Sequence, residues 1–429
     1  GMGIRVLNST SDLSSKLLAP TFLRALRAPL VVTPYLREPL LHNGRKWDVR
    51  TYVLATSVLP MRLYMFSEAI VRYAAASTYS PTSTDDGSVL TNTWVGQRLL
   101  QRGVSSITGS LANLCRLPTP HDADSNNGTA DAEEVGRCSV EMADAMRDAI
   151  GRLFLAAEPR IRQVYREQYA RAADGASDDE GEGGTGGDAS FRCAECYHLF
   201  GVDLIADSSR RMHVIEVNVA PDLSLSTQGA ACDGEHASKN CTDGSTAYDH
   251  TKLAAAYNTV RLVYSRQAVA QRLERLIERH AKEISELHLL VIPPTTTQVG
   301  ATTITPPPIL QQDVAEYLLD VLRETPASGC FAPVYPSLRH HAAHGKQLEL
   351  MASSRPASCD EPRSPDGTEA AAQRGVMCSS YERRLQMHTL IGIVLHDLEQ
   401  GDGASSFRER CERMLSDVPS GREGSWARR

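Results

Sequence analysis

The chain has 429 residues, a net charge of −7 and 41% hydrophobic residues, so it has room for more than one folded domain. Its acidic balance argues against a nucleic-acid-binding protein, and no apolar run approaches the ~20 residues of a membrane helix. We find no signal-peptide pattern. The charge is uneven, because residues 1–120 carry about +7 and the remainder about −14. The basic third could face an acidic partner, or it could be an ordinary solvated surface.

The first strand signals lie close together along the chain. Short runs rich in β-branched and aromatic residues, separated by brief polar breaks, predict strands. The expected strands cover residues 30–32, 49–56, 62–66 and 70–73. Tight connections between consecutive strands predict an antiparallel sheet.

A second strand pair and two helices follow. Residues 204–205 and 213–218 predict a hairpin around the polar turn 207–211. Apolar residues at helical spacing predict helices over 140–169 and 252–264. The segments 118–136 and 171–190 are rich in Asp, Gly, Ser and Asn, so we expect both to be disordered insertions.

The character of the sequence changes after residue 265. An apolar stripe predicts an amphipathic helix within 266–292, and the Pro/Thr-rich residues 293–308 are typical of a linker. We expect 293–429 to be a low-order extension with helices near 314–322 and 385–398.

Histidine and cysteine patterns in this sequence give weak signals for metal. His340, His341 and His344 fall in the low-order extension, where a polar loop is expected. Ten cysteines lack the spacing of a disulfide scaffold, and the pair Cys193 and Cys196 lacks a well-spaced second pair for zinc. Reduced thiols are the expectation.

Three oxygen-bearing side chains flank the second hairpin. Glu216 and Asn218 are two residues apart on a strand, so they point to the same face, which Asp203 on the paired strand can also reach. Carboxylate and amide oxygens suit Mg²⁺. The alternative from pattern alone is an acidic surface hairpin.

A second candidate set lies on the first sheet. Lys46, Asp48 and Arg50 alternate along one strand, and Arg72 follows on the next. Because arginine offers two parallel donors to phosphate or carboxylate, the set could hold a polyanion. A solvated outer strand face is the alternative.

Several segments of residues 1–264 resemble, in order, the motifs of the tubulin–tyrosine-ligase-like family. Residues 39–57 resemble "PLLI-x-G-x-KFD-L-R-x-YVLVTS", 196–203 resemble "CFELFGFD", and 215–224 resemble "LEVNxSPSLS". Residues 1–4, 90–92 and 249–252 resemble "GRGI", the start of "LTNYSxNK", and "DxxIK". The resemblance ends near residue 265.

This resemblance implies an α+β ATP-grasp fold over residues 1–265, in an enzyme that uses ATP and Mg²⁺ to join a free amino acid to a protein carboxylate through an acyl phosphate. Catalysis in such a site depends on positioning and charge neutralisation. The resemblance implies that Mg²⁺ and ATP are bound by Asp203, Glu216 and Asn218, and that Lys46 and Asp48 belong to the nucleotide site. It implies that Arg50 and Arg72 hold phosphoryl or carboxylate oxygens. Thr91, Asn92 and Lys252 are the residues implied for the amino acid.

The motif details are most similar to the polyglutamylating members of the family. They imply free glutamate as donor, the acidic tails of tubulin as acceptor, and a place in the cytoplasm on the cytoskeleton, with cilium, flagellum or basal body as narrower locations. Neither nucleic acid nor membrane is an expected partner. The alternatives are a glycine ligase on the same frame and a non-catalytic tubulin- or axoneme-binding homologue.

Three departures from the family pattern bear on activity. The family's N-terminal lobe lies upstream of "GRGI", so we expect a C-terminal half whose N-terminal lobe is missing from this chain. The hinge "VVQKYI" is replaced by residues 31–36 with Pro34, which has no N–H to donate. "NYSxNK" becomes residues 92–97, which lose a cation. The surviving triad and arginines favour a fragment of a longer ligase.

Overall fold

The computed structural model of the chain describes the elements and connections that position the candidate site. The described residues are 6, 32–58, 61–76, 78–83, 86–91, 108–110, 115, 132–174, 197–224, 244–264, 270–287, 290–291, 297–299, 302–304, 309–310, 312–353, 384–396 and 411.

Two compact units make up the fold, and each contains several separate stretches of sequence. The first unit comprises Gly1–Tyr52, Phe66–Ala149 and Phe200–Ala256. The second comprises Val53–Met65, Ile150–Leu199 and Tyr257–Arg429. This division differs from the sequence segmentation at residue 265, which stays a prediction, because residues 53–65 and 150–199 fall with the C-terminal stretch.

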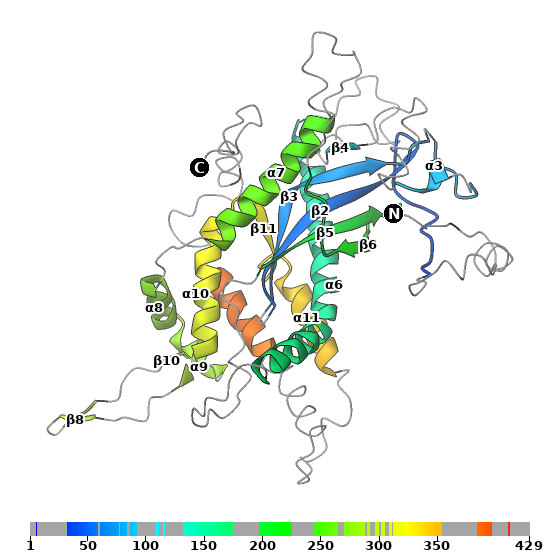
Figure 1. Cartoon of the computed structure of the whole chain (residues 1–429). Helices are drawn as coiled ribbons and strands as arrows, with labels where there is room; N and C mark the ends of the chain where they lie inside the picture. Colours follow the sequence, from blue (N-terminus) through cyan, green and yellow to red (C-terminus); the bar gives the residue numbers. More distant parts are fainter. Residues whose placement is uncertain are drawn as a thin grey trace, which may run out of the picture. The chain divides into compact units, whose positions relative to one another are not determined.

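A long antiparallel hairpin is built from β2 (Arg45–Val58) and β3 (Met61–Tyr73) (Figure 1). Strands predicted over 49–56, 62–66 and 70–73 are confirmed, but the expected break before Ile70 is absent. Residues on both sides of the break are buried, which keeps β3 extended through Ser67 and Glu68. Val32 lies outside any strand, and residues 30–31 are outside the described part of the chain.

The hairpin of β5 (His198–Ala206) and β6 (Met212–Asn218) lies next to β2 and confirms the second predicted strand pair, and its strands are antiparallel. A two-residue turn at Asn43 and Gly44, both with positive φ, joins β1 to β2 in the geometry that tight hairpins need. The remaining elements of the first unit are short or lie beside β2 and β3: β1 (Leu41–His42), α3 (Asp86–Val89), β4 (Thr108–Ser110), β5 (His198–Ala206) and β6 (Met212–Asn218).

Two long helices, α6 (Ala132–Asp174) and α7 (Gly244–Val263), contribute residues to both units. They confirm the helices predicted over 140–169 and 252–264. The expectation of disorder was wrong for 132–136 and 171–174, which belong to α6, because these ends are rich in Ala, Arg and Glu and simply extend the helix. Residues 118–131 and 175–190 lie outside the described residues.

The C-terminal stretch has a packed core instead of the low order expected for it. Apolar side chains of α8 (Ala270–Arg279), α9 (Ala281–Glu286), α10 (Gln312–Ala327) and the helix at 384–396 are buried against one another, with Leu318, Leu322 and Leu390 fully enclosed. The helices predicted near 314–322 and 385–398 are confirmed. The elements are α8 (Ala270–Arg279), α9 (Ala281–Glu286), β7 (Leu290–Val291), β8 (Thr297–Val299), β9 (Thr302–Ile304), β10 (Ile309–Leu310), α10 (Gln312–Ala327), β11 (Phe331–Tyr335) and α11 (His341–Ser353).

Two further predictions for this stretch need correction. The single amphipathic helix expected within 266–292 is divided at His280 into α8 and α9, and Leu290 and Val291 form β7. The expected linker 293–308 contains the small antiparallel hairpin β8–β9, in which the β-branched pairs Thr297–Ile304 and Val299–Thr302 face each other across the strands.

A buried charge network joins α10 to the β2–β3 hairpin within the second unit. Arg62 donates from Nε to Glu324 Oε2 at 3.0 Å and from Nη2 to Glu324 Oε1 at 3.1 Å. Glu324 also accepts from Tyr64 at 2.8 Å and Thr56 at 2.9 Å, and Asp320 pairs with Arg62 at 3.1 Å. We call these five residues the anchor network. All but Asp320 are buried, so it holds the C-terminal stretch against the hairpin.

The expected polar histidine loop is wrong. His341 and His344 lie on α11, and His344 is fully buried. The rings of His341 and His388 stack at 3.8 Å, and Tyr335 lies 5.6 Å from the His344 ring. Sequence pattern missed this packing because His388 and Tyr335 come from other elements.

Two cysteine pairs contradict the expectation of reduced thiols. Cys115 is bonded to Cys138, and Cys330 is bonded to Cys411, across 23 and 81 residues of sequence. Partners so far apart in the chain cannot be recognised from spacing. Among the described helices, none is both long and apolar enough to span a bilayer.

Candidate functional site

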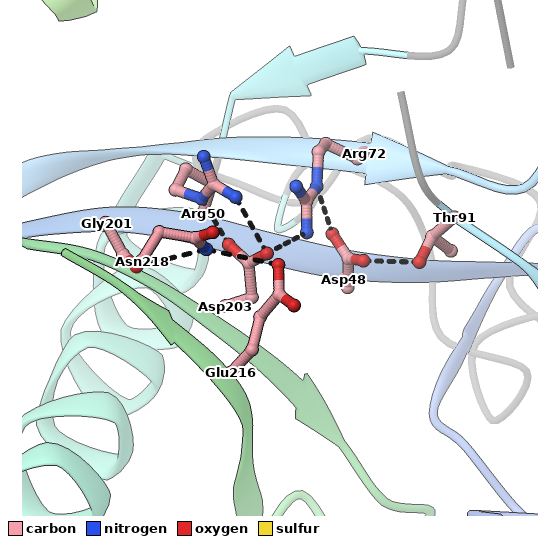
Figure 2. A network of polar contacts seen from close by, with 8 residues as sticks. All are labelled: Asp48, Arg50, Arg72, Thr91, Gly201, Asp203, Glu216 and Asn218. Atoms are coloured by element: carbon pink, nitrogen blue, oxygen red, sulfur yellow. Dashed lines mark hydrogen bonds and ion pairs between the residues drawn. The ribbon is translucent and has the colours of Figure 1, made fainter. Parts of the chain in front are cut away.

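The first half of β2 places alternate side chains on one face of the sheet. Lys46, Asp48 and Arg50 lie on this face because side chains of a strand alternate between its two sides. Lys46 and Asp48 are buried, whereas Arg50 is partly exposed. Neighbouring strands then bring Arg72 from β3 and Asp203 from β5 to the same face (Figure 2).

A continuous chain of ion pairs and hydrogen bonds links these residues. Thr91 donates to Asp48 Oδ2, and Arg72 donates to Asp48 Oδ1 at 2.6 Å and to Asp203 Oδ2 at 2.9 Å. Arg50 grips Asp203 with both Nε and Nη2, the latter at 2.8 Å from Oδ2. We call Asp48, Arg50, Arg72, Thr91 and Asp203 the site network.

The two aspartates of the site network differ in their electrostatic surroundings. Burial raises the pKa of Asp48 above its ordinary value, although Arg72 and Thr91 oppose the increase. Burial also acts on Asp203, but the hydrogen bonds and charges of Arg50 and Arg72 outweigh it and leave its pKa lowered. Asp203 therefore stays ionised at neutral pH, because two cations share it.

Glu216 and Asn218 extend the network toward solvent. Glu216 is the cross-strand partner of Asp203, and Asn218 donates from Nδ2 to Glu216 Oε1 at 3.1 Å and to the Gly201 carbonyl at 3.4 Å. The structure thus brings together the three residues predicted for Mg²⁺ (Figure 2). Glu216 is exposed and Asn218 partly exposed, so an incoming ligand can reach them.

The donor types of this set fit a magnesium ion. Asp203 and Glu216 offer carboxylate oxygens and Asn218 offers its amide Oδ1, which are the ligands that Mg²⁺ accepts beside water and phosphate. Across the described residues, no cluster of three His, Cys, Asp or Glu side chains is suited to a metal ion. The candidate set has two carboxylates and an amide, so it relies on outside ligands to complete a coordination shell.

Gly201 is a site residue that sequence reasoning passed over. A Cβ at this position would lie 2.9 Å from Pro221 Cβ and 3.3 Å from Arg50 Cδ. Only glycine leaves room for Arg50 to lie against β5 while it reaches Asp203. Its position two residues before Asp203 was the available signal.

Lys46 lies on the same face but bonds elsewhere. Its Nζ donates to the Tyr35 hydroxyl at 2.9 Å and to the Val89 carbonyl at 2.8 Å. Burial lowers its pKa to about 8, with the charge of Asp48 acting in the opposite direction. Tyr35 is a second residue that sequence reasoning did not assign to the site.

The predicted amino-acid contacts are only partly brought to this place. Thr91 is part of the site network, whereas Asn92 lies outside the described residues. Lys252 on α7 donates to the Ser224 carbonyl at 2.6 Å and lies 3.6 Å from Asp222. It is thus held by the segment after β6, six residues beyond Asn218.

Comparison with known families supports the resemblance read from the motifs. Residues 1–103 match the family model described as the tubulin-tyrosine ligase family. This stretch includes Lys46, Asp48, Arg50, Arg72 and Thr91. The resemblance to this family that the motifs indicated is thereby confirmed.

Curated relatives are tubulin-modifying enzymes. The chain is 27% identical over 231 residues to tubulin monoglutamylase TTLL4 of Homo sapiens, covering 53% of this chain and 16% of that protein. It is 26% identical over 203 residues to tubulin polyglutamylase ttll-4 of Caenorhabditis briggsae, covering 47% and 28%. For tubulin polyglutamylase ttll6 of Danio rerio the identity is 22% over 202 residues, covering 46% and 22%. The chain thus spans less than a third of each relative's length.

Proposed function

We propose that this chain is part of an ATP- and Mg²⁺-dependent ligase of ATP-grasp fold that adds glutamate to glutamate side chains of tubulin tails. The observation that carries the proposal is the site network beside Glu216 and Asn218. It puts two arginines, two aspartates and an open oxygen-donor set on one sheet face, in a sequence similar to tubulin glutamylases.

Asp203, Glu216 and Asn218 are the residues that would hold Mg²⁺ in this proposal. ATP with Mg²⁺ would supply the phosphoryl group that activates a substrate carboxylate as an acyl phosphate, which the amine of free glutamate then attacks. The protein's own task is to orient the reactants and to offset negative charge, because little covalent chemistry falls to its side chains.

Arg50 and Arg72 suit the task of charge neutralisation. The pKa of each is raised by neighbouring carboxylates despite burial, so both stay cationic through any accessible pH. Planar guanidinium groups can bind phosphoryl or carboxylate oxygens in pairs. Lys46 and Asp48 would contact the nucleotide, and Thr91, with Asn92 and Lys252, the amino acid.

Partner and location follow from the same proposal. Tubulin tails are acidic, so the basic N-terminal third provides a complementary surface. Residence on the cytoplasmic cytoskeleton, including cilium, flagellum or basal body, would give access to this substrate.

The test is incorporation of labelled glutamate into tubulin by the full natural protein that contains this chain. Asp203→Asn and Glu216→Gln should each reduce incorporation by at least about 100-fold, since each removes charge from the proposed metal set. The matched control is Glu278→Gln, an exposed carboxylate on α8, which should leave the rate unchanged.

The alternatives give different results in the same assay. Incorporation of labelled glycine in place of glutamate would identify a glycine ligase. If the protein does not bind ATP, and if its binding to tubulin survives the Glu216→Gln substitution, it is a non-catalytic binding protein. That result would end the ligase proposal.

A further inference from the structure

Both carboxylate oxygens of Asp203 are engaged by guanidinium groups. Arg50 Nε bonds Oδ1, while Arg50 Nη2 and Arg72 Nη2 lie 2.8 Å and 2.9 Å from Oδ2. Only 2% of the surface of Asp203 is exposed, so little of its carboxylate is open to a ligand beside these three contacts. A cation approaching Asp203 must therefore compete with an arginine.

The two arginines are not equally bound to the network. Arg72 has a second carboxylate in Asp48, which Thr91 holds in place. Among the described residues, Asp203 is the one carboxylate that bonds to Arg50. If one arginine leaves Asp203, Arg72 remains anchored through Asp48, and Arg50 is the one that departs.

Arg50 is also placed to move. Its side chain is 16% exposed, compared with 9% for Arg72, and its Cδ lies beside Gly201, which has no side chain of its own. Glu216, opposite Asp203 on β6, is exposed on the same side. Glu216 lies next to the Arg50–Asp203 pair (Figure 2), so a ligand held by Glu216 is also close to that pair.

We propose that Arg50 is a metal-responsive positioning residue: a divalent cation bound by Asp203, Glu216 and Asn218 displaces the Arg50 fork, which then turns to a substrate phosphate or carboxylate. This inference rests on the proposed function for the identity of the metal set. It predicts that metal binds before the anion, because Arg50 is committed to Asp203 until the metal arrives. A merely structural ion pair would stay closed when the metal binds.

The test is binding of Mn²⁺ alone, measured by the loss of its free electron paramagnetic resonance signal. Arg50→Lys keeps the positive charge but loses the two-pronged grip, so it should raise Mn²⁺ affinity about fivefold to tenfold, and Arg50→Gln at least as much. Asp203→Asn should abolish binding. The control Arg45→Lys makes the same change on the same strand but on its other face, where Arg45 donates to the Ala74 carbonyl, and should have no effect.

A second readout follows the guanidinium directly. The Nε–H resonance of Arg50, assigned through its loss in Arg50→Lys, should shift when Mg²⁺ is added to the wild-type protein. The Arg45 resonance should stay in place.

The outcomes separate this inference from the proposed function. If Mn²⁺ binds to wild type and Arg50→Lys binds it no more tightly, the displacement of Arg50 is refuted while the metal set stands. A gain for Arg50→Gln alone would mean that charge, and not the fork, opposes the metal, which also refutes it. If no variant binds Mn²⁺, both the inference and the metal assignment fall.

Discussion

The anchor network and the site network are both largely buried, and both include residues of β2 and β3. They differ in whether an exposed carboxylate adjoins them. In the anchor network, Glu324 accepts from Arg62, Tyr64 and Thr56, all of them buried. In the site network, Asp203 is just as buried, but its cross-strand partner Glu216 is exposed. The partners of Glu324 are thus enclosed in the protein, whereas the site network adjoins a carboxylate that faces solvent.

On the proposed function, this difference separates a structural network from one that binds a ligand. Bidentate geometry, burial and opposite charge occur in both networks, so none of these features by itself indicates function. What distinguishes the site network is adjoining oxygen donors that a ligand can reach. Arginine pairs on a strand are thus informative only when their surroundings are known.

The largest expected effect comes from opening the anchor network. Glu324→Ala leaves the buried Arg62 with the partly exposed Asp320 as its one carboxylate partner among the described residues, and breaking such a pair costs about 3–5 kcal/mol. The free energy of unfolding of the second unit, followed by hydrogen exchange in α10, should fall by that amount. Replacing both partners, with Arg62→Met and Glu324→Leu together, should recover a large part of the loss. A double variant as unstable as Glu324→Ala would contradict the view that an orphaned charge is the cause.

Acid should act on the second unit through its histidines. Burial lowers the pKa of both His344 and His388 to about 4. For His344, the charges of His340, His341 and Arg152 act in the same direction. For His388, the charges of His341 and His344 do so. The unfolded chain takes up these protons near pH 6.5, so stability is full above that pH and declines as pH falls toward 4. Each histidine contributes up to about 3 kcal/mol of loss at pH 4.

The measurement is urea unfolding between pH 7 and pH 4.5, compared with a variant that cannot take up the proton. His344→Leu should flatten the pH dependence, while the exposed His396→Gln should not. Asp203 behaves differently, because its lowered pKa preserves its stabilising charge until pH falls below the ordinary aspartate value. If the free energy of unfolding measured in urea is no lower at pH 4.5 than at pH 7, the histidine mechanism is wrong.

Each network contains one threonine that donates to an aspartate or glutamate, so replacing each threonine with valine removes one hydrogen bond from each network. Thr91 donates to Asp48 and Thr56 donates to Glu324. Among the described residues, Arg72 is the one other side chain that donates to Asp48, so Thr91→Val should cost about 2 kcal/mol, the range for a hydrogen bond to a charged group. The measurement is the free energy of opening of β2, obtained from hydrogen exchange of its backbone amides in the wild type and in the variant.

Thr56→Val should have the smallest effect. Glu324 keeps both bonds from Arg62 and the one from Tyr64, so the loss should be about 1 kcal/mol. Equal losses for the two valine variants would show that the number of remaining donors does not set the cost.

Much of the candidate site could be predicted from local sequence. Alternation placed Lys46, Asp48 and Arg50 on one face, and the antiparallel hairpin placed Glu216 opposite Asp203. These relations hold over a few residues of one strand or one turn, so they need no knowledge of the rest of the chain. Motif order then joined the two halves of the site across more than 100 residues.

The anchor network and the histidine packing could not be predicted this way. Arg62 and Glu324 are 262 residues apart, and His341 meets His388 from a different helix. A charged residue within a predicted helix or strand is expected on its solvated face, because the sequence of that segment does not show a partner from elsewhere in the chain. The same reason hid the Cys330–Cys411 bond and made the C-terminal stretch look poorly ordered.

The sequence by itself predicted the β2–β3 and β5–β6 hairpins, the helices α6, α7 and α10, the face that the candidate residues share and the resemblance to tubulin-modifying ligases. Only the tertiary structure decided that both oxygens of Asp203 are held by arginines, that Lys46 bonds Tyr35 and that α10 closes a charge network with the hairpin. The physical reason is that side-chain periodicity is a local property of the backbone. The pairing of buried charges depends on which distant segments exclude water from them together.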